Sequence, residues 1–245
     1  MSESLNKGVT AVNKYQQIAY EIEQHIHEHN LAQGTKLDSL DTLTKRYNVS
    51  RSTISKALDT LEKRGAIFQQ RGSGIFVRRQ RREGYMSLLV TSGFSANFQD
   101  SNIRYDVLNV EKTVADEDVA NNLHIEAGAP VYLVERLVYM DEEKLCKEVS
   151  YFPVQVVPYL NKEIAEQSIF HYLETAYKIN ISFADVYLVI DQLNEAEADM
   201  LDLPLLSPGL YMEQVVYLAT GIPFDYSKVV YHYKHAKFFL QSVNN

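Results

Sequence analysis

Polar and basic side chains are concentrated in residues 50–56, which read SRSTISK. Guanidinium, ammonium and hydroxyl groups are the donors that contact base edges and phosphates in the DNA major groove. Four side chains of this segment could act in this way: Arg51, Thr53, Ser55 and Lys56. We therefore predict that residues 50–56 contact DNA, provided that a helix presents them on one side.

The sequence predicts such a helix between residues 50 and 65. Ser50 is a residue type common at helix N-caps, and the apolar residues that follow have the three- and four-residue spacing of one buried face. These apolar residues are Ile54, Ala57, Leu58 and Leu61. The polar and basic residues fall on or beside the opposite side, as insertion into a major groove requires.

A hairpin with a basic, glycine-rich tip is predicted next. Two short apolar runs, at residues 66–68 and 75–77, are joined by the segment QQRGSG. Arg71 supplies the basic side chain of this tip. A helix followed by such a hairpin is typical of a winged helix. An ordinary amphipathic surface helix would share the periodicity, but it would not require the adjacent tip.

Two earlier segments predict the helices that pack against this one. Residues 14–30 carry a stripe of apolar side chains, and residues 37–47 form a shorter helix before a turn at residues 48–49. The first helix contains three histidines at alternate positions, of which only His25 and His29 share a face. We therefore expect no metal site there.

Length and composition favour a globular protein of two domains. The chain has 245 residues, of which 46% are hydrophobic, and no apolar run is long enough to span a membrane. Its first residues lack the layout of a signal peptide, so we expect a cytoplasmic protein. Cys146 is the only cysteine, which excludes an intramolecular disulfide and a cysteine-based zinc site.

Charge is distributed unequally along the chain. Residues 1–85 contain 14 basic and 9 acidic side chains, whereas residues 86–245 contain 10 basic and 23 acidic ones. A basic part beside an acidic part is the pattern expected when only one domain faces phosphate groups. Between them, the segment RRQRREG at residues 78–84 could follow the DNA backbone or serve as a solvated connector.

The second half of the chain predicts an α+β domain with a mainly antiparallel sheet. Runs rich in β-branched and aromatic residues predict six strands, at residues 102–111, 131–140, 145–152, 186–193, 209–218 and 224–233. Helical patterns occur at residues 116–123, 162–165, 168–177 and 195–201. No phosphate-binding loop, dinucleotide fingerprint or zinc-protease motif occurs, so we expect no cofactor, no metal and no catalytic residues.

The amino-terminal segment resembles the DNA-binding domain of the GntR family of bacterial transcription regulators. The resemblance rests on YQQIAYEIEQHI, LDSLDTLTKRYNVSRSTISKALDTLEKRG and QQRGSGIFV, and it extends over residues 15–77. It implies that Arg51, Thr53 and the wing glycine Gly72 contact DNA.

Two positions depart from the usual pattern of that family. Residues 38–41 read DSLD, where the family commonly has Pro-Ser-Glu and a basic residue. Ser55 stands where a second arginine is common. Both changes remove positive charge from the predicted interface, so the operator sequence need not match the usual one of the family.

The second half resembles the UTRA effector domain of the HutC subfamily, whose fold is similar to that of chorismate lyase. The matching motifs are VER at 134–136, LCKEVSY at 145–151, SIF at 168–170, EAEADMLDL at 195–203 and GIPFDYS at 221–227. They occur in the order of the family, and the resemblance covers nearly all of residues 86–240.

This second resemblance implies a pocket for a small effector. In members that bind sugar phosphates, the pocket combines an early loop, strand arginines, a helix start, a late acidic residue and a tyrosine. The residues implied for this chain are Ser92, Phe94, Ser95, Arg136, Glu148, Ser168, Phe170, Asp225 and Tyr231. Loop amides, a helix N-terminus and an arginine would make an adequate anion site.

Three positions depart from a sugar-phosphate pocket. Val138 replaces the second strand arginine, Phe170 replaces a tyrosine, and His232 stands where a late arginine is common. Losing an arginine removes a strong charge-assisted contact to phosphate. The effector is then either a sugar phosphate held more weakly or a compound with a different anionic group.

Two of the implied pocket residues also have a structural alternative. Arg136 could pair with a cross-strand carboxylate such as Glu148. Asp225 could cap a turn. Both alternatives stay open from the sequence alone.

Together these features predict a sequence-specific transcription regulator, with a winged helix-turn-helix at residues 1–77, a basic linker at 78–85 and an effector-binding and dimerisation domain at 86–245. One winged helix contacts too few bases and phosphates for tight binding, so we expect a homodimer on an inverted repeat of operator DNA. We expect a repressor that a small anionic metabolite, such as a sugar phosphate, releases. The competing interpretation is an enzyme of chorismate-lyase-like fold with a vestigial DNA-binding head, although no nucleophile with a paired base is visible.

Overall fold

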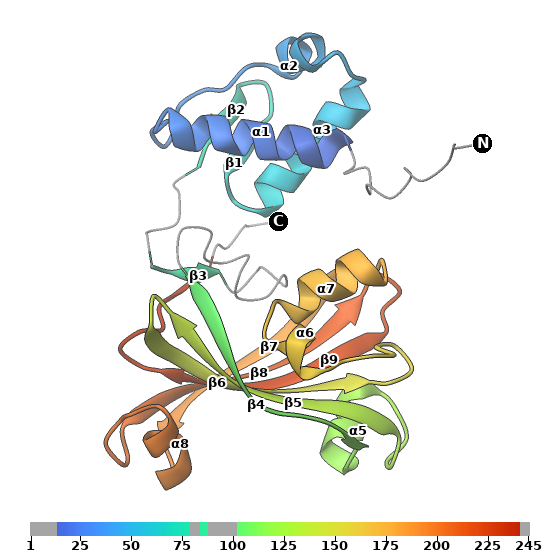
Figure 1. The fold of residues 1–245 in the computed structure, drawn as a ribbon. Helices are drawn as coiled ribbons and strands as arrows, with labels where there is room; N and C mark the ends of the chain where they lie inside the picture. The colour runs from blue at the N-terminus through green and yellow to red at the C-terminus, as the bar shows by residue number, and fades with distance from the viewer. Residues whose placement is uncertain (1–13, 79–83, 88–101, 241–245) are drawn as a thin grey trace, which may run out of the picture. The chain divides into compact units, whose positions relative to one another are not determined.

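The computed structural model describes residues 14–78, 84–87 and 102–240 (Figure 1). The chain divides into two compact units between residues 82 and 83, inside the segment predicted as a linker. Each unit has a hydrophobic core of its own. Within the described ranges, no helix is both long and apolar enough to cross a membrane.

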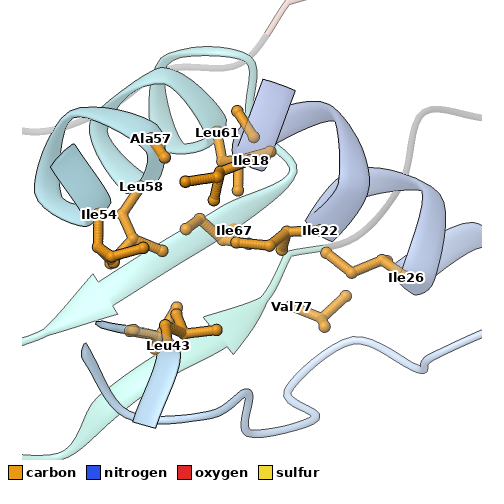
Figure 2. Close-up of a cluster of buried hydrophobic side chains, with 12 residues drawn as sticks. Ile18, Ile22, Ile26, Leu43, Ile54, Ala57, Leu58, Leu61, Ile67 and Val77 are labelled. Atoms are coloured by element: carbon orange, nitrogen blue, oxygen red, sulfur yellow. The ribbon is translucent and has the colours of Figure 1, made fainter. Parts of the chain in front are cut away.

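The amino-terminal unit has the order of elements predicted for a winged helix-turn-helix. Its elements are α1 (Lys14–Glu28), α2 (Leu40–Tyr47), α3 (Arg51–Lys63), β1 (Ile67–Gln70) and β2 (Gly74–Val77). The two strands pair antiparallel. The apolar stripes of the helices meet the hairpin in one buried cluster (Figure 2). Because this cluster uses the apolar face of α3, the polar face of that helix is left for contacts with other molecules.

Local signals fix both ends of α3. Ser50 is its N-cap, and the Ser50 hydroxyl accepts a hydrogen bond from the Thr53 amide at 3.2 Å. After the last turn, Gly65 adopts a φ of +73°, and its amide donates to the Glu62 carbonyl at 2.9 Å. Asn48, in the left-handed conformation, ends α2 and turns the chain into α3. Glycine and asparagine tolerate this conformation better than other residues, which explains why the helices end there.

The carboxy-terminal unit is an α+β domain built on a six-stranded antiparallel sheet. In chain order its elements are β3 (Met86–Ser87), β4 (Ile103–Val114), α5 (Glu117–Leu123), β5 (Pro130–Met140), β6 (Glu143–Pro153), α6 (Lys162–Ala165), α7 (Ile169–Ala176), β7 (Ile181–Gln192), α8 (Glu195–Met200), β8 (Pro208–Leu218), β9 (Pro223–His232) and β10 (Phe238–Phe239). The strand order is β4-β5-β6-β9-β8-β7. The six predicted strands are confirmed, with ends that shift by a few residues. The short parallel pair of β3 and β10 was not predicted, because two residues carry no period.

Helices cover both faces of this sheet. α6 and α7 lie on one face, and α5 and α8 lie on the other (Figure 1). Side chains alternate between the faces of a strand, so register decides which residues meet. Arg136 on β5 is opposite Glu148 on β6, and Ser150 on β6 is opposite Ser227 on β9.

Two apolar clusters occupy the ends of the face that α6 and α7 cover. On β5, Val134 belongs to one cluster and Val138 to the other. Arg136 lies between them. The middle of this face is therefore polar, whereas both of its ends are packed with apolar side chains.

Candidate DNA-binding and effector-binding sites

The amino-terminal end of α3 presents the side chains predicted to contact DNA. Arg51 and Lys56 are exposed, and Thr53 and Ser55 are half-buried. The Thr53 hydroxyl lies 2.8 Å from that of Ser50. None of these four predicted residues belongs to the buried face of α3, which consists of Ile54, Ala57, Leu58 and Leu61.

An acidic side chain also lies at this surface. The Asp41 carboxylate on α2 is 3.4 Å from Nη1 of Arg51, and both side chains are largely exposed. A second pair of the same length joins Asp38 to Arg46. The sequence identified both aspartates as departures from the family pattern, but it gave no sign of their partners.

The hairpin carries the remaining predicted DNA contacts. Arg71 and Gly72 are exposed at the tip, where Gly72 adopts a φ of +77°. Below the tip, the rings of Phe68 and Phe76 stack with centroids 5.4 Å apart. This stack supports the two strands that hold the tip.

Arg136 is the centre of the candidate effector site, and it is 5% exposed. Its Nε donates to Glu148 Oε2 at 2.8 Å, and its Nη2 donates to the same oxygen. Its Nη1 donates to the carbonyls of Ala165 and Gln167, at 3.0 and 3.1 Å. The guanidinium also lies 4.5 Å from the ring centroid of Tyr105. All three nitrogens are thus engaged, and the pairing with Glu148 that the sequence left open is present.

The turn that Arg136 holds leads directly into α7. Ser168 is the N-cap of that helix and accepts a hydrogen bond from the His171 amide at 3.4 Å. Phe170 packs on Phe224 with ring centroids 5.5 Å apart. Phe170 is therefore part of the apolar cluster under α7, where a tyrosine hydroxyl would have added a polar group.

A line of buried polar groups crosses the sheet beside Arg136. The Asp225 carboxylate accepts from the Ser227 hydroxyl at 2.7 Å, and that hydroxyl lies 3.0 Å from the hydroxyl of Ser150. Burial raises the pKa of Asp225 to about 8, against the lowering effect of the Ser227 hydrogen bond. Because Asp225 lies within β9, it does not cap a turn, an alternative that the sequence had left open.

Sequence reasoning missed Ser150 and Ser227. Each stands two residues after a predicted site residue, Glu148 or Asp225, on the same strand. Residues two apart on a strand share a face. That rule would have found both serines.

Other implied pocket residues lie apart from this polar line. Tyr231 is buried in the apolar cluster with Cys146 and meets the Phe238 ring edge-on, at 4.9 Å between centroids. Burial raises the pKa of the Cys146 thiol well above its usual range, so this cysteine is a packed residue. His232 faces the other side of the sheet, as the neighbour of Tyr231, and stacks on His235 at 3.9 Å. Ser92, Phe94 and Ser95 lie outside the described residues.

A separate cleft of about 460 Å³ lies beside the edge strand β4. It is lined by the bulge at residues 107–109 and by residues 159–162. None of the implied effector residues lines it. The cleft therefore does not coincide with the candidate effector site that the family resemblance implies.

Comparison with known proteins identifies the chain. Residues 14–77 match the bacterial regulatory proteins of the gntR family, and residues 99–237 match the UTRA domain. The chain belongs to the GntR family. The HTH-type transcriptional regulator YydK of Bacillus subtilis is 46% identical to this GntR protein over 229 residues, which are 94% of this chain and 97% of YydK. The two matched domains confirm the predicted resemblance to the GntR family and the predicted fold class.

Two further comparisons support the same conclusion. The crystal structure of YydK superposes on this GntR protein with a TM-score of 0.84 at 44% identity, covering 95% of this chain and all of that one. The mannosyl-D-glycerate transport/metabolism system repressor MngR of Escherichia coli is 27% identical over 228 residues, 92% of this chain and 94% of MngR. This GntR protein is a DNA-binding transcription regulator, so the enzyme interpretation is wrong.

Substitution of Arg136 tests how the buried pair is held. Arg136→Ala leaves the Glu148 charge buried without its cation, and we expect the free energy of unfolding to fall by about 3–5 kcal/mol. The double change Arg136→Met with Glu148→Leu should recover most of that loss, because an apolar pair avoids the desolvation of two charges. Urea denaturation of the full chain measures both variants. If the Arg136→Ala variant were as stable as the wild type, the buried pairing would be contradicted.

Asp225 makes stability depend on pH. Its pKa in the fold is about 8, whereas an unfolded aspartate titrates at about 3.9. The stabilising effect of the protonated group is therefore complete below the unfolded pKa and is lost as pH rises through the folded pKa. Asp225→Asn removes this titration, so the variant should gain stability relative to the wild type between pH 5 and pH 8.5.

Thermal unfolding at the two pH values measures the difference. Asp199→Asn, at an exposed position on α8, is the matched control and should show no such trend. A difference between Asp225→Asn and wild type that stays constant with pH would mean that Asp225 titrates normally.

Proposed function

We propose that this regulator is a repressor that binds operator DNA as a homodimer and leaves it when a small, sugar-like metabolite with an anionic group enters the effector domain. It acts in the cytoplasm, where bacterial operator DNA lies. The proposal rests on one observation: the same chain contains an exposed basic helix end in one domain and a line of buried polar groups in the other. The first suits DNA, and the second suits a small polar ligand.

The proposed DNA contacts come from two elements. Arg51, Thr53, Ser55 and Lys56 enter the major groove from α3, and Arg71 and Gly72 reach the flanking backbone from the wing. The helix end offers guanidinium and hydroxyl donors to base edges. The excess of basic residues before position 86 attracts the phosphates.

A strand at the edge of the sheet supports the proposed homodimer. Among the described strands, β7 pairs only with β8, and its other edge is unpaired. It exposes apolar side chains on both faces, with Ile190 77% and Tyr187 65% exposed. A long, unpaired, apolar edge strand favours association with another chain. A twofold pair of identical chains would match an inverted repeat in DNA.

The polar line favours a ligand rich in hydroxyl groups. Carboxylates and hydroxyls are the acceptors and donors that bind sugar hydroxyls, and the line contains both kinds of group, in Glu148, Asp225, Ser150 and Ser227. All three guanidinium nitrogens of Arg136 already donate to Glu148 or to backbone carbonyls. An anionic group must therefore displace Glu148 or bind near Ser168 at the start of α7. The relative MngR is named as the repressor of a mannosyl-D-glycerate system, and that compound joins a sugar to a carboxylic acid. A sugar acid is therefore as good a candidate as a sugar phosphate.

Arg51→Ala tests the proposed DNA contact. The two probes are a duplex that the wild-type protein selects from a random library and a shuffled duplex of the same composition. If Arg51 donates to a guanine edge, the variant should lose about 1–3 kcal/mol on the selected duplex and much less on the shuffled one. Lys63→Ala, at the far end of α3, is the charge-matched control. Equal losses on both duplexes would reduce Arg51 to a phosphate contact.

A ligand screen tests the effector site. Sugar phosphates and sugar acids are screened by thermal shift against the full chain, since a bound ligand raises the unfolding temperature. A compound that releases the selected duplex should bind the free protein about 5–150-fold more tightly than the DNA-bound protein, because the coupling is reciprocal. Asp225→Asn should weaken this binding, and Asp199→Asn should not. Equal affinity with and without DNA would rule out release by this compound through allostery.

A further inference from the structure

Asp41 is an acidic residue on the surface that is proposed to contact DNA. It is the second residue of α2, and its carboxylate pairs with Arg51, the first residue of α3. The exposed side-chain fractions are 68% for Asp41 and 70% for Arg51. An ion pair as exposed as this adds little to folding stability. A role in folding therefore gives no strong reason to place a negative charge there.

We infer that Asp41 determines the DNA specificity of this regulator by orienting Arg51 and by repelling phosphate. The inference rests on the proposed base contact of Arg51. It goes beyond that proposal by assigning a role to a residue on a different helix, one that need not touch DNA itself. In this sense Asp41 is a positioning residue.

The shape of the guanidinium group allows Arg51 to contact a base and Asp41 at the same time. An arginine has five N–H donors in a rigid plane, and a guanine edge uses two of them. Enough donors remain for a carboxylate at the same time. Asp41 can thus hold Arg51 in one orientation before and after DNA is bound, which lowers the entropy lost on binding. Without the carboxylate, the long Arg51 side chain is free to contact phosphates of any sequence.

The negative charge of Asp41 acts on DNA of any sequence. Non-specific binding, which is the binding that a protein shows to every DNA sequence, depends almost entirely on attraction to phosphates. A carboxylate at the interface weakens that attraction for every sequence alike. On the preferred sequence, the oriented Arg51 offsets this loss through its base contact. The ratio of the affinity for the preferred sequence to the affinity for other sequences rises, because the affinity for other sequences is lower than it would be without the carboxylate.

A competing explanation is that Asp41 only stabilises α2. An acidic residue in the first turn of a helix interacts favourably with the helix dipole. Asp38 lies at the same end of α2 and has an ion pair of the same 3.4 Å length, with Arg46. Arg46 is not among the residues proposed to contact bases. Asp38→Asn therefore removes the same charge and a similar ion pair, and it serves as the matched control.

The experiment compares full-length variants on the selected duplex and on the shuffled duplex, at one salt concentration. Asp41→Asn should bind the shuffled duplex more tightly and the selected duplex no more tightly. The affinity ratio should fall by about five- to tenfold, which is within the range for one bidentate base contact. Asp38→Asn should leave the ratio within about twofold of the wild type, since losing a charge alone acts on all sequences. In an Arg51→Ala background, Asp41→Asn should no longer change the ratio.

A repeated selection from the random library adds a second measurement. Asp41→Asn should lose sequence preference at the same base pair as Arg51→Ala. Thermal unfolding checks that each variant is folded, and Asp41→Glu, which keeps the charge, should bind the shuffled duplex like the wild type. Equal ratios for Asp41→Asn and Asp38→Asn would show that Asp41 is only a surface acid. A fall in ratio that persists in the Arg51→Ala background would show that Asp41 acts without Arg51, which also overturns the inference.

The outcomes separate this inference from the proposed function. If the wild-type protein selects no duplex, the proposed operator binding is wrong. If Arg51→Ala keeps the wild-type ratio, the base contact of Arg51 is wrong and the inference falls with it. If Arg51→Ala loses discrimination and Asp41→Asn does not, only the inference about Asp41 is overturned.

Discussion

The buried pair of Arg136 and Glu148 holds together the centre of the effector domain. Two ions removed from water lose a large hydration energy, and only close pairing with further hydrogen bonds offsets that loss. Here the guanidinium bonds to Glu148 on the next strand, to the carbonyl of Ala165 at the end of α6, and to the carbonyl of Gln167 in the turn before α7. The ring of Tyr105 on β4 completes its surroundings. One side chain thus connects three strands with the turn that places the start of α7.

This arrangement constrains what a ligand can do. Asp225, Ser227 and Ser150 bond to one another, so under the proposed function a hydroxyl-rich compound would exchange these bonds for its own and leave the ion pair in place. An anion that seeks Arg136 must compete with Glu148 and with the turn before Ser168. Such competition would move the start of α7. The same contacts that stabilise the domain therefore supply a route by which ligand binding could change its conformation.

This protein has the function of its family, and it departs from the family pattern at a few positions of its two domains. Membership in the GntR family assigns it to transcription regulation. Asp41 introduces an acid beside Arg51, and Val138 and Phe170 make the effector face more apolar than a phosphate pocket requires. These differences lie at the sites proposed to bind DNA and ligand. Asp41 is exposed, and Val138 and Phe170 are apolar residues in or against the hydrophobic clusters, so none of the three places an unpaired polar group in a core.

The sequence by itself determined the elements of this protein and the task of its first domain. Periods of two and of 3.6 residues, the serine cap before residue 51 and the glycine after α3 are local signals that act within a few residues. The segment SRSTISK and the glycine-rich tip likewise lie close together along the chain. Tertiary structure alone decided that all three guanidinium nitrogens of Arg136 are hydrogen-bonded, that Ser150 meets Ser227, and that Asp41 pairs with Arg51. These contacts depend on strand register and on packing between elements distant in sequence, and no local pattern specifies which buried polar groups will then satisfy one another.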